Sequence, residues 1–174
     1  MVSLDRVFSI SMLNQSIFDI QFWGDQVWLA SSNGMITVVD RLSQQVIKHI
    51  KVGEAHVRCL HVSENVLFAG YSDGYIRVFN AQFELIYAQL AHEKRVFSLV
   101  MSGNKLISVG GDAHIRSWTW NSTELIQALP AVPAHIQAIN AVVLSPCGRY
   151  LATGSMDKTI KIWDASELTL LKVI

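Results

Sequence analysis

The sequence predicts an all-β protein made of four consecutive copies of one four-stranded antiparallel unit. Three observations support this prediction: a turn that recurs at a regular spacing, apolar strand patterns on both sides of each turn, and no convincing helical period. Of the 174 residues, 51% are hydrophobic and only 16% are charged, which is a globular composition rather than a disordered one.

Four Asn or Asp residues mark the repeated turn, because these residues tolerate the positive φ angles of tight hairpins. They are Asn33, Asp73, Asp112 and Asp157, which stand 40, 39 and 45 residues apart. A strand follows each turn, and its apolar residues occupy every second position, as at Ile160 and Ile162. Four matching registers at one period indicate a structural repeat rather than chance.

Three further strands complete each unit. In the last unit two of them are expected before the turn, at 139–144 and 150–153. The third is expected at 168–174, after the strand that follows the turn. Four antiparallel strands in about 40 residues form one blade of a β-propeller. The predicted blades are 15–50, 51–90, 91–131 and 132–174, and we interpret residues 1–14 as the remnant of a preceding blade.

The last unit shows a family resemblance. The residues that carry it are Ala134-His135, Leu144-Ser145-Pro146 and the run 151–164, which ends in Trp163-Asp164. This pattern resembles a near-consensus WD repeat, and looser copies extend the resemblance over roughly residues 15–174. The resemblance implies a scaffold that catalyses nothing and binds proteins or peptides through the propeller face. Because the family usually closes rings of about seven blades, it also implies an arc of a larger ring, or a ring completed by self-association.

The resemblance further implies a structural hydrogen-bond network, since a buried indole N–H needs an acceptor and a buried carboxylate needs donors. By matching position its members are His135, Ser155, Asp157 and Trp163. The third repeat has His92, Asp112 and Trp118, but Gly110 stands at the position of the hydroxyl, so we expect a complete network only in the last blade. His56 also follows an alanine and is interpreted as structural in the same way.

The residues expected to line the propeller face flank the first strand of each blade or precede the turn. Those best suited to anchor a partner are Phe18, Arg58, Arg95, Phe97 and Met156. Arginine and aromatic residues are typical interface anchors, and methionine adapts to varied partners.

Other functions lack support in the sequence. No catalytic, metal or cofactor motif is present, and the two cysteines form neither a disulfide framework nor a metal spacing. Fourteen basic and fourteen acidic residues balance, so we expect no nucleic-acid partner, and no apolar run reaches the 18 residues of a membrane span. A cytoplasmic location is expected. The alternative function is that of a propeller domain fragment within a larger enzyme or regulatory protein.

Overall fold

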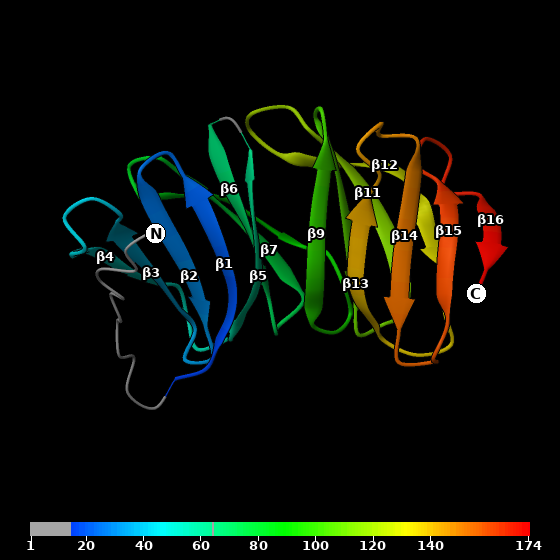
Figure 1. Cartoon of the computed structure of the whole chain (residues 1–174), viewed down its shortest axis with the longest axis horizontal. Helices are drawn as coiled ribbons and strands as arrows, with labels where there is room; N and C mark the ends of the chain where they lie inside the picture. Colours follow the sequence, from blue (N-terminus) through cyan, green and yellow to red (C-terminus); the bar gives the residue numbers. More distant parts are fainter. Residues whose placement is uncertain (1–14, 64) are drawn as a thin grey trace, which may run out of the picture.

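The computed structural model describes residues 15–63 and 65–174, which fold into four antiparallel sheets. The four sheets stand side by side along the chain, from the N-terminal end to the C-terminal end (Figure 1). Each sheet contains four strands in sequence order, and no helix occurs in the described residues. The prediction of an all-β chain of four four-stranded units is therefore confirmed.

The sheets are named blades one to four. Blade one holds β1 (Ile17–Trp23), β2 (Gln26–Ser31), β3 (Met35–Asp40) and β4 (Val46–Lys51). Blade two holds β5 (Val57–Ser63), β6 (Val66–Tyr71), β7 (Tyr75–Asn80) and β8 (Leu85–Leu90). Blade three holds β9 (Val96–Ser102), β10 (Lys105–Gly110), β11 (His114–Trp120) and β12 (Leu125–Pro133). Blade four holds β13 (Ile139–Leu144), β14 (Tyr150–Ser155), β15 (Ile160–Asp164) and β16 (Leu170–Val173).

The observed limits differ slightly from the predicted ones. The outermost strands β4 and β12 run one and two residues past the expected ends at 50 and 131, because each stays paired with the strand before it. The proposed remnant of a blade in residues 1–14 lies outside the described residues.

The recurring turn has the same backbone conformation in every blade. The residue after each turn Asn or Asp has a left-handed φ, at Gly34 (78°), Gly74 (86°), Ala113 (65°) and Lys158 (71°). The turn side chain also accepts a hydrogen bond from the backbone N–H two residues later, as Asp157 does from Thr159 at 3.0 Å. The repeat therefore preserves the turn geometry even where glycine is absent, at a cost of about 1–2 kcal/mol for each residue that carries a Cβ atom there.

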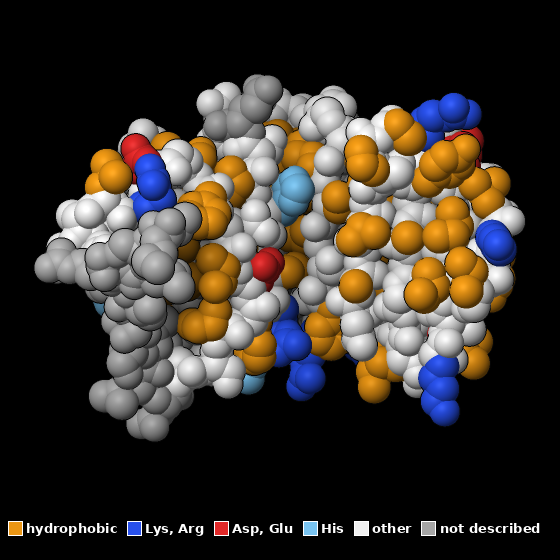
Figure 2. All heavy atoms as spheres, in the orientation of Figure 1, with side chains coloured by type: hydrophobic (Ala, Val, Ile, Leu, Met, Phe, Trp, Pro, Cys, Tyr) orange, Lys and Arg blue, Asp and Glu red, His pale blue; other side chains and the backbone are white. Residues whose placement is uncertain are grey.

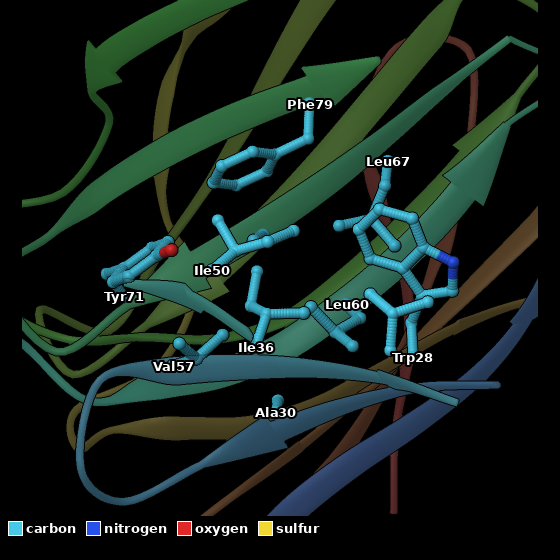
Figure 3. Packing of buried hydrophobic residues seen from close by; sticks show 11 residues of the cluster. Trp28, Ala30, Ile36, Ile50, Val57, Leu60, Leu67, Tyr71 and Phe79 are labelled. Atoms are coloured by element: carbon cyan, nitrogen blue, oxygen red, sulfur yellow. The ribbon is translucent and has the colours of Figure 1, made fainter. Parts of the chain in front are cut away.

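Facing blades bury their apolar sides against each other. Between blades one and two, Trp28 and Ile36 meet Leu67 and Phe79, and all four side chains are fully buried (Figure 3). Burying one such side chain stabilises the fold by roughly 1.5–3 kcal/mol. Equivalent clusters fill the gaps between blades two and three and between blades three and four. Most of the core thus lies between sheets, so each blade depends on its neighbours.

Candidate functional site

The first strand of every blade contains a β-bulge at its second position. In blade one, Ile17 pairs with Ser31 and Asp19 pairs with Ala30, so the residue between them has no partner in β2. The same irregularity recurs in β5, β9 and β13. The four bulged residues, called the bulge row, are Phe18, Arg58, Phe97 and Asn140. A bulge takes a side chain out of the regular alternation of the strand and re-aims it.

Three members of the bulge row lie against one another, because β5 packs between β1 and β9. The guanidinium carbon of Arg58 lies 3.9 Å from the ring centre of Phe18 and 5.2 Å from that of Phe97. The His56 ring stacks on Phe18, with 6.4 Å between ring centres and 24° between ring planes. Residues from three blades thus form one cluster at the edge where β1, β5 and β9 begin (Figure 1).

Arg58 has unused hydrogen-bonding capacity. Its Nε atom is buried and lacks a hydrogen-bond partner among the described residues. Burial lowers the pKa of Arg58, and the nearby positive charge of Arg95 lowers it further. In Figure 2, basic side chains stand at the lower edge of the molecule, between the ends of β5 and β9. This edge therefore offers positive charge beside aromatic rings.

The structure brings together most of the residues predicted to bind a partner. Phe18, Arg58 and Phe97 are in contact, and the exposed Arg95 adds its charge to them. Met156 lies apart in blade four, where its backbone N–H donates to the carbonyl of Ala138 at 2.9 Å and its side chain is exposed.

The interpretation of His56 as the repeat equivalent of His92 and His135 is wrong. His92 and His135 stand four residues before the first residue of the next strand, whereas His56 stands only one residue before Val57. His56 therefore occupies the position of Arg95 in the repeat and lies beside the bulge row, against Phe18. Counting residues back from the strand, rather than following the preceding alanine, would have shown this difference in the sequence.

Blade four contains a buried chain of hydrogen bonds, but its hydroxyl is not the predicted one. The indole N–H of Trp163 donates to Thr153 Oγ1 at 2.9 Å. Thr153 Oγ1 lies 2.8 Å from His135 Nε2, and His135 Nδ1 lies 2.8 Å from Asp157 Oδ2.

The prediction of Ser155 as the network hydroxyl is wrong. Trp163 pairs with Leu151, and Ser155 lies four residues further along β14, about 13 Å away at the rise of a strand. Thr153 lies half as far. Ser155 instead donates to the carbonyl of Ala138 at 2.9 Å.

Blade three contains the same network, so the prediction that only the last blade completes it is also wrong. Trp118 Nε1 donates to Ser108 Oγ at 2.9 Å, and this oxygen lies 2.9 Å from His92 Nε2. His92 Nδ1 lies 2.8 Å from Asp112 Oδ1. The glycine at position 110 does not interrupt the network, because the hydroxyl belongs to Ser108, two residues earlier. Thr153 likewise stands two residues before Ser155.

Hydrogen-bond counting favours a neutral histidine in this network. The indole donates to the hydroxyl, the hydroxyl donates to Nε2, and the Nδ1–H donates to the carboxylate, which satisfies every group. Burial lowers the pKa of His92, against the opposing effect of Asp112. Burial raises the pKa of Asp112, but the hydrogen bonds that His92 and Arg116 donate, together with the positive charge of Arg116, outweigh it and hold this pKa far below its usual value.

The order Ser108, His92, Asp112 also resembles a hydrolase triad. A catalytic serine must reach a substrate carbonyl carbon, yet the side chain of Ser108 is fully buried and its oxygen already accepts the indole N–H. These contacts favour a structural role.

Two other features bear on function. In the part of the chain that the structure describes, no three His, Cys, Asp or Glu side chains are grouped as metal ligands would be. Within the same residues, no helix is long and apolar enough to cross a membrane.

Comparison with known proteins places this geometry in a family. Residues 47–80 and 126–164 match the family model "WD domain, G-beta repeat". Each match begins in the last strand of one blade and ends in the third strand of the next. One sequence repeat therefore links two neighbouring blades covalently.

Curated relatives and solved structures agree with this match. The chain is 40% identical over 80 residues to the probable cytosolic iron-sulfur protein assembly protein CIAO1 homolog of Schistosoma japonicum, covering 44% of this chain and 23% of that protein. It is 33% identical over 151 residues to zinc finger CCCH domain-containing protein 17 of Oryza sativa subsp. japonica, covering 86% of this chain and 34% of that protein.

A chain in the crystal structure of the mitotic checkpoint complex matches with a TM-score of 0.83 at 24% identity, over 94% of this chain and 52% of that one, and shows the fold alone. This chain spans between 9% and 34% of the length of eight of the curated relatives it matches. The repeated blades, the repeat matches and the relatives together show that the chain belongs to the WD40-repeat family.

Proposed function

We propose that this WD40-repeat chain is a non-catalytic scaffold that binds a protein partner at the edge carrying the bulge row. The observation that supports this proposal most directly is the position of Arg58. A guanidinium group held between two aromatic rings, and outside every ion pair among the described residues, has the composition of an interface anchor. WD40 propellers typically mediate protein interactions.

The proposal is tested by affinity capture with the double variant Arg58→Ala/Arg95→Ala. We expect quantitative mass spectrometry to show at least a tenfold loss of the proteins that the unaltered chain retains. The matched control is Arg41→Ala/Arg149→Ala, because these arginines lie at the opposite ends of their blades, next to Asp25 and Tyr150. Unchanged capture by the first variant, with a normal melting temperature, would remove these arginines from the proposal.

The proposal extends to self-association through the end blades. One isoleucine position is equivalent in all four blades: Ile36, Ile76 and Ile115 are fully buried against the following blade, whereas Ile160 is 48% exposed. In Figure 2, hydrophobic side chains spread over the strands of blade four. At the other end, Ile20 is 53% exposed although its equivalents Leu60 and Leu99 are buried. Each end face thus has the pattern of a blade-to-blade contact, and we assign a second copy as its occupant.

Light scattering of the purified chain tests this extension. We expect a discrete dimer, and Ile160→Asp is expected to shift it to the monomer because a carboxylate is costly to bury between sheets. A monomer at every concentration would contradict self-association. It would favour the alternative in which further blades of a larger enzyme or regulatory protein cover these faces.

A further inference from the structure

The bulge row combines positive charge with an absence of acidic partners. None of the six ion pairs among the described residues includes Arg58 or Arg95. Three of the other four described arginines are paired with a carboxylate, as Arg77 is with Asp73 at 2.8 Å, and Arg149 is not. The chain has no net charge, so the unpaired arginines are a local feature rather than a consequence of composition. A like charge nearby disfavours the charged form of Arg58, and an anion bound beside both arginines would favour it.

The geometry of Arg58 restricts how an anion would bind. The rings of Phe18 and Phe97 lie against the guanidinium, so the sites for a ligand are on its edge. The Nε atom is buried, which leaves the two terminal nitrogens. Two N–H groups in one plane match the two oxygens of a carboxylate in the paired geometry that arginine forms with acids.

The surroundings favour a carboxylate on a protein segment. A planar carboxylate lies in the plane of the guanidinium and fits between ring faces, whereas a tetrahedral phosphate projects oxygens out of that plane. The Phe18 side chain, which is 37% exposed, and the neighbouring His56 offer contact area to side chains beside the acid. Because the rings hold Arg58 in place before binding, less side-chain entropy is lost on association.

We infer that the bulge row is an acceptor site for an acidic side chain of a protein partner, with Arg58 binding the carboxylate through both terminal nitrogens and Arg95 supplying a second positive charge. This inference rests on the proposed function and specifies the chemistry of the partner. Arg58 is proposed to bind through two coplanar N–H groups, so a lysine with the same charge would not replace it. Binding weakens as salt rises, since exposed charges are screened.

The test uses the whole chain and a fluorescein-labelled peptide of sequence Ala-Glu-Phe-Glu-Ala, with Ala-Gln-Phe-Gln-Ala as the neutral match and Ala-phosphoSer-Phe-phosphoSer-Ala as the phosphate probe. Fluorescence polarisation gives the Kd, and the Arg58 side-chain Nε–H signal in a nitrogen-15 NMR spectrum reports the location. We expect saturable binding of the glutamate peptide that shifts this signal, and at least tenfold weaker binding of the glutamine peptide.

The variants separate charge from geometry. Arg58→Lys and Arg58→Ala are both expected to weaken binding of the glutamate peptide at least tenfold, whereas Arg149→Ala leaves it unchanged. Equal binding of the glutamine peptide, full binding by Arg58→Lys, or preference for the phosphoserine peptide would each overturn the carboxylate assignment. If the protein capture described above is lost in Arg58→Ala/Arg95→Ala while the glutamate peptide does not bind, the scaffold function stands and this inference fails.

Discussion

Replacing Gly74 by alanine is expected to lower the free energy of unfolding by about 3 kcal/mol. Gly74 has a φ of 86°, where a residue with a Cβ atom costs about 1–2 kcal/mol. A Cβ atom there would also lie 2.1 Å from the carbonyl oxygen of His92, a contact that requires the backbone to move. That movement is opposed, because the N–H groups of Ala91 and His92 both donate to the Gly74 carbonyl. Overpacking of this kind adds about 1–3 kcal/mol.

The matched control for Gly74→Ala is Gly103→Ala. Gly103 also has a left-handed φ, 57°, but a Cβ atom there would have no neighbour within 4 Å. Gly103→Ala should therefore lower the free energy of unfolding only by the cost of a left-handed φ, about 1 kcal/mol. Urea denaturation followed by circular dichroism measures both variants, and equal losses would show that the contact with His92 is not restrictive.

The regular features of the fold could be predicted from the sequence because they depend on local chemistry. The turn at Asp157 and the alternation of Ile160 and Ile162 depend only on residues close in the sequence. The repeat period and the order of the strands in each blade could therefore be predicted from these patterns. The ends of the blades at β4 and β12 did not follow from the sequence, because the last pairs of these strands depend on the neighbouring strand.

The site was only partly predictable, because its contacts cross between blades. Phe18, Arg58 and Phe97 could be placed on the same edge from the repeat, but the bulges that bring them together depend on the pairing register. The network hydroxyl was misplaced by two residues for a related reason. Ser155 and Thr153 lie on the same side of the strand, and only the reach of the Trp163 indole distinguishes them.

The network makes its own prediction: Thr153→Val is expected to lower the free energy of unfolding by about 3 kcal/mol. Valine keeps the shape and the strand preference of threonine but removes the hydroxyl. The buried N–H of Trp163 and the Nε2 atom of His135 then both lose their partner. Each buried polar group left unsatisfied costs about 1–3 kcal/mol. Thermal and urea unfolding measure the loss.

Ser155→Ala is the matched control, because Ser155 is the neighbouring hydroxyl on the same strand and is partly exposed. Water can replace its hydrogen bonds, so we expect a loss of about 1 kcal/mol or less. A loss from Ser155→Ala larger than that from Thr153→Val would restore Ser155 to the network. A double-mutant cycle with Trp163→Phe gives a stricter test. Without the indole N–H, Thr153→Val leaves one fewer buried group unsatisfied. The double variant should therefore lose less stability than the sum of the losses of the two single variants.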